Sequence, residues 1–173
     1  MPANYSGFKN NIQNYLENQS AGSESDAAQY FADECMGILT SVVPTLRVTN
    51  GVLPVNSSAI QGAFLSAFNS IKSSGNNTLA NWTPVATAWS NAVTGTAPIW
   101  VDSVSVNVWT ITGAAGVSPA AALLFKAFGP PNKNASQVAT DFRSAIQTAM
   151  DLSTHTVVNS TSGVTVGPTP GLS

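Results

Sequence analysis

The stretch that most restricts the fold is residues 98–112, where apolar and polar residues alternate strictly. Every second position holds a valine, and the positions between are polar. The valines are Val104, Val106 and Val108, and the polar residues are Ser103, Ser105 and Asn107. A two-residue period of this kind is typical of a β-strand with one buried face. Segments with helical periodicity lie on both sides of it in the sequence, so we predict that they pack against this strand.

Six segments carry the 3.6-residue period of amphipathic helices. They are residues 6–17, 26–43, 58–74, 83–94, 118–128 and 135–152. Each begins at a residue or pair that favours a helix start: Ser6, Ser25, Ser58 with Gln61, Thr83-Pro84, Ser118-Pro119 and Asn134 with Gln137. Gly75 and the Gly-Pro-Pro run at 129–131 are typical helix stops.

Shorter strand signals lie near both ends of the chain. Asn50-Gly51 indicates a hairpin within residues 45–55, and residues 154–158 and 163–166 have strand composition. Residues 167–173 carry two prolines and two glycines and no charge, which favours an extended tail. We therefore predict an α+β fold, with about six helices packed on a small sheet centred on the strand at 98–112.

The predicted chain has two parts. Residues 1–153 form a single globular α+β domain, and residues 154–173 form a strand-forming, partly extended C-terminal arm. A two-stranded hairpin is marginal in isolation, so we predict that a neighbouring subunit holds this arm. For the core, the clearest apolar stripes predict one buried cluster of Phe64, Leu65, Phe68, Val106, Val108, Phe142 and Ile146.

The charge content is the unusual feature of the composition. Only 8% of the 173 residues are charged, against roughly 25% in average soluble domains, and the net charge is −2. The six basic residues are scattered, which disfavours direct binding to nucleic acid or to a membrane surface. The first six residues show no signal peptide, and no apolar run is long enough to cross a bilayer. We expect synthesis in a host cytoplasm.

Residues that could carry chemistry are few. Cys35 falls inside a helical pattern, where a small buried side chain is expected rather than a nucleophile. His155 is the one histidine, and a catalytic triad would require it to meet Asp102, Asp141 or Asp151 beside a serine. One cysteine and one histidine do not make a zinc site. We predict no catalytic residue, no metal and no cofactor, and keep a small hydrolase as the weakest alternative.

The four tryptophans bracket one region and leave two readings open. Trp82, Trp89, Trp100 and Trp109 are either large core residues or an exposed binding face. Asp102 close to Trp100 resembles a sugar-binding platform, so a carbohydrate-binding module using exposed tryptophans stays an alternative function. The predicted subunit interface consists of Trp100, Trp109, Val157, Val158, Val164 and Val166.

The chain resembles the small structural proteins of tailed-bacteriophage virions. The resemblance lies in the low charge, in the Ala-, Ser-, Thr-, Asn- and Val-rich body, in the helix at 137–147 running into Thr156-Val-Val158, and in the Thr/Gly/Pro tail. It implies a non-enzymatic oligomeric subunit of the tail, neck or baseplate, or alternatively a capsid decoration protein. Its partners would be other virion subunits and copies of itself, and its location the virion.

Overall fold

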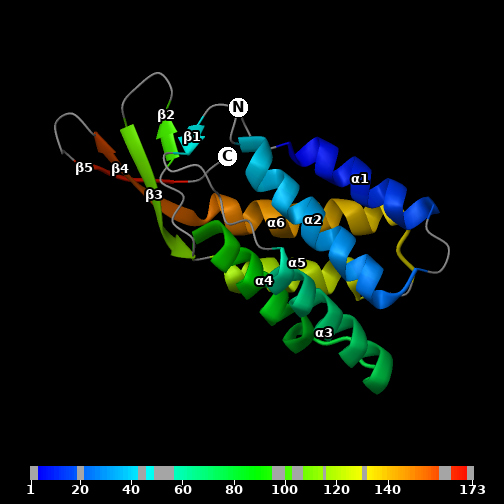
Figure 1. Cartoon of the computed structure of the whole chain (residues 1–173). Coiled ribbons are helices and arrows are strands. Elements are labelled where there is room, and N and C mark those ends of the chain that lie inside the picture. Colours follow the sequence, from blue (N-terminus) through cyan, green and yellow to red (C-terminus); the bar gives the residue numbers. More distant parts are fainter. Residues whose placement is uncertain are drawn as a thin grey trace.

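The computed structural model describes residues 4–18, 22–42, 46–48, 57–94, 100–102, 107–114, 116–129, 132–159 and 165–170. Within them lie six helices: α1 (Tyr5–Asn18), α2 (Glu24–Val42), α3 (Ser58–Ser74), α4 (Leu79–Thr94), α5 (Val117–Phe128) and α6 (Ala135–Asp151). They form a bundle (Figure 1). None of the described helices is long and apolar enough to cross a membrane.

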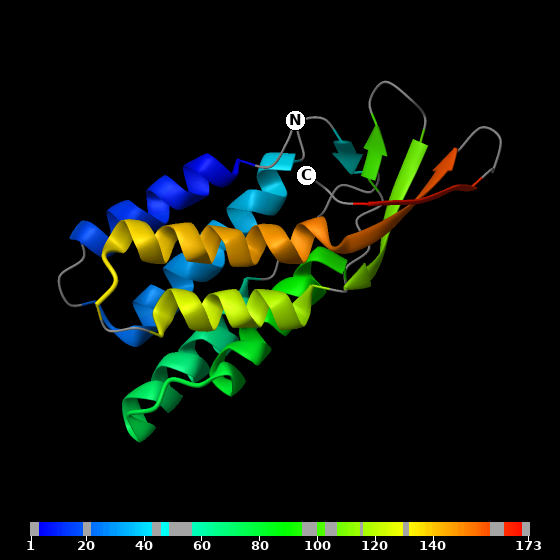
Figure 2. The same ribbon diagram turned by 180° about the vertical axis from the view of Figure 1, so that it is seen from behind.

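Five short strands lie together at one end of this bundle. They are β1 (Leu46–Val48), β2 (Trp100–Asp102), β3 (Asn107–Ala114), β4 (Ser153–Asn159) and β5 (Thr165–Pro170). All neighbouring pairs are antiparallel and the order is β1-β2-β3-β4-β5. Figures 1 and 2 show that α6 runs directly into β4, so the sheet continues the bundle lengthwise and does not lie beneath it.

The core of the bundle is built around α6, which packs against α1, α4 and α5, while α2 packs against α1 and α3. Phe142 of α6 lies at the centre of a cluster of phenylalanine rings. Its ring centroid is 5.1 Å from that of Phe8, 5.5 Å from Phe31 and 5.6 Å from Phe64. Rings at these separations and steep angles attract one another edge to face, which adds to the gain from apolar burial.

The predicted α+β fold class is wrong. Every member of the described hydrophobic core comes from a helix, so the folded body whose side chains the structure describes is all-α. The helices bury their apolar stripes against each other and not on a sheet. The cause is visible in the sequence: six long amphipathic stripes together enclose a complete core, so no sheet face is needed to cover them.

The predicted core cluster is confirmed for three of its five helical members. Phe64, Phe142 and Ile146 are buried in one cluster, and Leu65 and Phe68 are partly buried against it. Val106 lies outside the described residues, and so does the side chain of Val108.

The single long strand predicted at 98–112 is also wrong. Two antiparallel strands replace it: Trp100 of β2 lies opposite Trp109 of β3, and Val101 lies opposite Val108. Each strand keeps the alternation of apolar and polar residues in its own sequence. This two-residue period is the same on both strands, so it does not show where the chain reverses direction. Residues 103–106, where four of the six alternating positions lie, are outside the described residues.

Described residues of the two other regions with strand signals, at 45–55 and at the C-terminus, belong to the same sheet. Leu46 of β1 lies opposite Asp102 of β2, a pairing distant in sequence, while the second arm of the predicted Asn50-Gly51 hairpin lies outside the described residues. Residues 153–159 pair with β3 of the same chain, and residues 165–170 pair with β4. The predicted tail thus begins within β5, and residues 171–173 are outside the described part.

Several helix starts differ from prediction by a few residues. The N–H of Gly7 donates to Asn4 Oδ1, so Asn4 and not Ser6 caps α1. Ser23 and Asp26 exchange backbone-to-side-chain hydrogen bonds at the start of α2, in place of the predicted Ser25 cap. The largest difference is α4, which begins one turn before the predicted Thr83-Pro84 start and holds Pro84 inside the helix.

Candidate functional site

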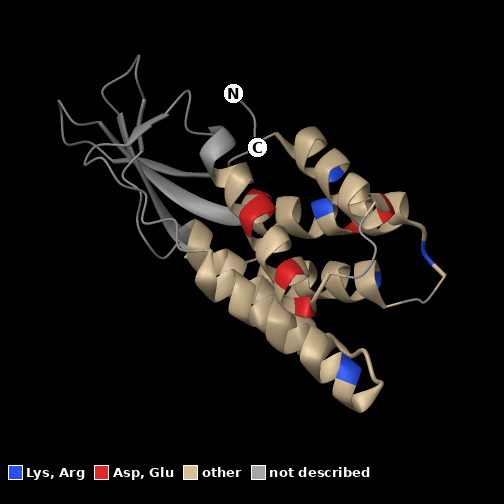
Figure 3. Cartoon of the chain, turned by 45° about the vertical axis from the view of Figure 1, so that its right-hand side comes forward, with Lys and Arg blue, Asp and Glu red and all other residues tan. Residues whose placement is uncertain are grey.

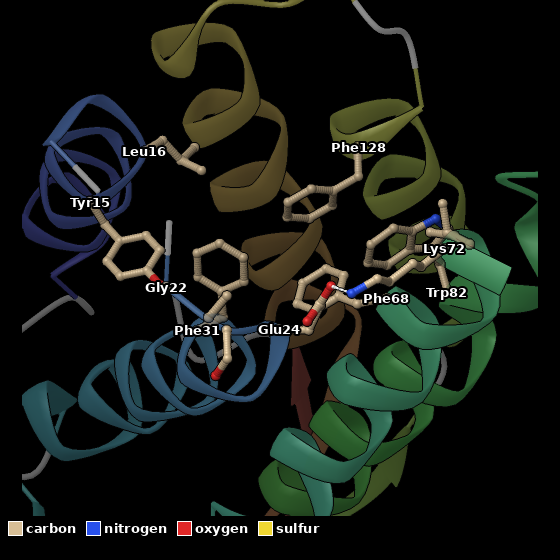
Figure 4. A pocket seen from close by; sticks show the side chains of 12 residues that line it. Tyr15, Leu16, Gly22, Glu24, Phe31, Phe68, Lys72, Trp82 and Phe128 are labelled. Atoms are coloured by element: carbon tan, nitrogen blue, oxygen red, sulfur yellow. Dashed lines mark hydrogen bonds and ion pairs between the residues drawn. The ribbon is translucent and has the colours of Figure 1, made fainter. Parts of the chain in front are cut away.

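A hollow of about 480 Å³ lies in the bundle. It lies where the end of α1, the start of α2, the last turns of α3, the first turn of α4 and the end of α5 meet. Figure 4 shows the side chains of five aromatic residues gathered around it. We call it the aromatic hollow, after Tyr15, Phe31, Phe68, Trp82 and Phe128.

The floor of the aromatic hollow is made of stacked and edge-on rings. Trp82 and Phe128 stack with their centroids 4.6 Å apart and 12° between their planes. Phe68 contacts both of them edge to face, at 6.2 Å and 6.3 Å. Trp82 is fully buried, whereas Phe68 and Phe128 are partly exposed. The rings therefore lie in fixed positions and offer an apolar surface to the cavity.

Asn77 links the two helices that carry Trp82 and Phe128. The indole Nε1–H of Trp82 donates to Asn77 Oδ1 at 2.7 Å, and Asn77 Nδ2 donates to the carbonyl oxygen of Phe128 at 2.9 Å. A buried indole N–H needs an acceptor, and the last carbonyls of a helix lack partners within the helix. Asn77 satisfies both groups and fixes the start of α4 against the end of α5.

The opposite wall of the hollow comes from α1 and α2. The Tyr15 ring stacks on Tyr30 with centroids 4.1 Å apart, and it meets Phe31 edge to face at 5.5 Å. Partial burial, with a smaller effect of the Asp26 carboxylate, raises the pKa of Tyr15 above its ordinary value. Tyr15 therefore stays a neutral phenol at ordinary pH and contributes a ring rather than a charge.

An ion pair crosses the edge of the hollow. The Lys72 ammonium on α3 donates to Glu24 Oε1 at the start of α2, as the dashed line in Figure 4 marks. The hydrogen bond from Lys72 is the main reason that the pKa of Glu24 lies below its ordinary value. Both side chains are well exposed, so the pair contributes little to stability and can open at small cost.

The arrangement suits the binding of an apolar group. The lining holds aromatic and aliphatic side chains, with one ion pair at the edge, and its volume lies in the range of small-ligand and side-chain pockets. Within the described part of the chain, no three His, Cys, Asp or Glu residues come close enough to hold a metal ion. The hollow can accept an apolar group and surround it with rings.

The predicted interface residues lie in the sheet, away from this hollow. Trp100, Trp109 and Val157 occupy directly opposite positions on β2, β3 and β4, and Val158 lies opposite Val108. Val166 belongs to β5, and Val164 is outside the described residues. The structure does not describe the side chains of these strands, so the predicted interface stays a prediction.

The other two tryptophans are core residues. Trp82 and Trp89 are 0% and 1% exposed, and the Trp89 indole donates to the carbonyl oxygen of Ile146 at 3.2 Å. They offer no sugar-binding face, which leaves only Trp100 and Trp109 for the carbohydrate alternative. Cys35 is fully buried, and burial raises the pKa of its thiol well above the ordinary value.

Asp102, one of the three carboxylates that the weakest alternative, a hydrolase, could use, does not lie beside His155 on the sheet. His155 of β4 lies opposite Ile111 of β3, while Asp102 of β2 follows Val101, which lies opposite Val108. The two positions are about four residues apart along β3, or roughly 13 Å. Asp141 is bound by two lysines on another part of the molecule.

Sequence reasoning missed the aromatic hollow. Phe31, Phe68 and Phe128 fall in predicted helices, and Trp82 is one of the four tryptophans predicted to be either core residues or a binding face. Nothing in a single sequence says that these rings meet, since they come from four different helices. The one available signal was the position of Tyr15 and Phe128 in the last turns of two helices, directly before polar connections. Searches against protein-family models, curated proteins and solved structures found no match for this chain.

Proposed function

We propose that this chain is a non-enzymatic structural subunit of a tailed-bacteriophage virion, acting through subunit–subunit contacts in the tail, neck or baseplate. The observation that carries the proposal is the aromatic hollow, whose lining suits the burial of a neighbour's apolar side chain. Aromatic residues in a shaped pocket are the usual anchors of protein–protein contacts. Its partners are other virion subunits and copies of itself.

The distribution of charge supports the same proposal. Figure 3 shows few charged residues on the described helices, separated by long uncharged stretches. The ion pairs that the structure describes join one element to another, such as Glu24 of α2 to Lys72 of α3. A surface with so little charge has weak repulsion between copies, which suits a protein that works inside an assembly.

The sheet offers a second contact region. It extends from one end of the bundle, and β1 and β5 are its outer strands, each paired with one neighbour among the described strands. An outer strand presents backbone donors and acceptors that a strand of another subunit can pair with. Pro168 and Pro170 lack N–H donors on β5, so β1 is the better edge for such pairing.

The first test is mass spectrometry of purified particles from the source, which should find this chain in a fixed copy number. Absence from the particles would overturn the virion assignment. The contact mechanism is tested by Ile71→Glu, which places a charge in the lining of the aromatic hollow. We expect a folded protein with normal helical circular dichroism and reduced incorporation into particles.

The matched control is Leu79→Glu, because Leu79 is 48% exposed and does not line the hollow. It should incorporate normally. Equal incorporation of both variants would exclude the hollow as a contact.

Deletion of residues 155–173 tests the sheet in the same assay: the truncated chain should keep its helical circular dichroism and should no longer be incorporated into particles. A capsid decoration role would be distinguished by the location of the chain on imaged particles.

A further inference from the structure

The corner between α5 and α6 gathers three charged side chains in a chain that has few. Lys126 lies in the last turn of α5, Lys133 precedes α6, and Asp141 lies in the second turn of α6. Lys126 Nζ donates to Asp141 Oδ1 at 2.9 Å. Lys133 Nζ donates to Asp141 Oδ2 and to the backbone carbonyl oxygen of Lys126. Two ammonium groups thus share one carboxylate.

This cluster carries one excess positive charge in a partly sheltered place. The side chains of Lys133 and Asp141 are only 16% and 14% exposed, and that of Lys126 is 62% exposed. Burial alone would raise the pKa of Asp141, but the hydrogen bonds and charges of Lys133 and Lys126 outweigh it and hold that pKa below its ordinary value. Asp141 is therefore ionised at neutral pH, and it neutralises one lysine of the two.

A hollow of about 330 Å³ opens beside the cluster. Besides the three charged residues, Ser136, Gln137 and Thr140 of α6 line it. The first turn of α6 has no acidic side chain, so the positive end of the helix dipole adds to the lysine charges. Asp141 and the Lys126 carbonyl take three of the six ammonium N–H donors in the described structure. The other donors and the Ser136 hydroxyl remain for a ligand.

We propose that this hollow binds a phosphate group through Lys126, Lys133 and Ser136. Lysine ammonium groups act as point charges with several donors, which suits a tetrahedral oxyanion, whereas a planar carboxylate is better matched by an arginine fork. A bound phosphate can neutralise the single excess positive charge of this cluster. The phosphate is either free or carried on a small molecule, and the site lies apart from the aromatic hollow.

The test uses the full chain and two probes, inorganic phosphate and glycerol phosphate. Each is titrated at constant ionic strength against chloride, and binding is followed by ³¹P line broadening and by the melting temperature. The wild type should show a saturable response to either probe. Lys126→Gln/Lys133→Gln should lose that response, and Lys9→Gln/Lys72→Gln should keep it, because it removes the same charge elsewhere.

Phosphate also raises the melting temperature of many proteins without binding, by exclusion from their surface. An equal, unsaturable response in both double variants would identify that effect and overturn the proposal. Two single variants keep the test decisive if the lysine variants fold poorly. Asp141→Asn should bind phosphate several-fold more tightly, because the internal competitor is gone, and Ser136→Ala should bind more weakly. Unchanged affinity in both would leave the lysines as a structural clamp only.

Discussion

The helices α3 and α6 have the same length, 17 residues, yet they hold very different positions in the fold. Helix α6 packs against α1, α4 and α5 and buries Ala139, Phe142, Ala145, Ile146, Ala149 and Met150. Helix α3 packs against α2 and α4 and buries Ile60, Phe64 and Ala67. The apolar stripe predicted both helices well, but only the tertiary structure shows which one carries the core.

The largest expected effect is a loss of stability when a core ring of α6 is removed. Phe142→Ala on α6 removes a fully buried ring that contacts four other phenylalanines, among them Phe8 and Phe128. We expect a loss of about 3–5 kcal/mol in the free energy of unfolding, measured by urea denaturation. If the variant does not fold, Phe142→Leu should still show a loss of more than about 1 kcal/mol. A smaller loss would contradict the central position of α6.

The corresponding change on α3, Phe68→Ala, should reduce the free energy of unfolding by a smaller amount. Phe68 is partly exposed, and its ring contacts those of Phe31, Phe64, Trp82 and Phe128. Because its ring already contacts water, Phe68→Ala should reduce the free energy of unfolding by about 2 kcal/mol. The same denaturation experiment measures it. A loss equal to that of Phe142→Ala would mean that α3 is as deeply packed as α6.

These two helices also show what a sequence can reveal and what it cannot. Periodicity is a local property, so residues 58–74 and 135–152 were located within a residue or so. Pairing between strands is not local, and neither β1 with β2 nor β3 with β4 could be derived from their own residues. The Thr83-Pro84 signal misplaced the start of α4, because Pro84 lies inside the helix and not at the first helical position that proline favours. The aromatic hollow depends on five helices meeting, which no local pattern encodes.

The two helix starts look alike in sequence and differ in geometry. Asn134 has an extended backbone, with ψ at 163°, and its side chain accepts the N–H of Gln137 in a complete capping box. The residue before α3 is Ser57, with helical dihedral angles and no side-chain cap, so Ser58 is the first helical residue and not the N-cap that we predicted. An N-cap residue must be extended for its oxygen to reach the third residue of the helix.

This difference gives the third prediction. Asn134→Ala should reduce the free energy of unfolding by about 1 kcal/mol, because it removes the side-chain acceptor of the Gln137 N–H and with it the capping box. Ser57→Ala should change stability by less than about 0.5 kcal/mol, since no cap bond is lost. Both are measured as shifts in the denaturation midpoint at constant slope. Equal losses would mean that Ser57 caps α3 in solution.

The smallest expected effects come from two glycines of the α3 region, and they have opposite signs. Gly62 lies inside α3 and Gly75 directly after it, and an added Cβ would meet no atom within 4 Å at either position. Sterics therefore cannot distinguish the two substitutions. Gly75 has φ at 67°, in the left-handed region, and its N–H donates to the Ile71 carbonyl at the helix end. Only backbone conformation separates these glycines, which makes them a matched pair.

Gly75→Ala should reduce stability by about 1 kcal/mol, because an L side chain is strained at that φ. Gly62→Ala should increase stability by about 0.5–1 kcal/mol, because alanine loses less backbone entropy than glycine inside a helix. Both variants keep the charge and nearly the volume of the wild type, so differences in the thermal midpoint report the backbone alone. Loss at both positions would show that α3 packs against something at Gly62. Gain at both would mean that the chain does not keep the left-handed turn that ends α3.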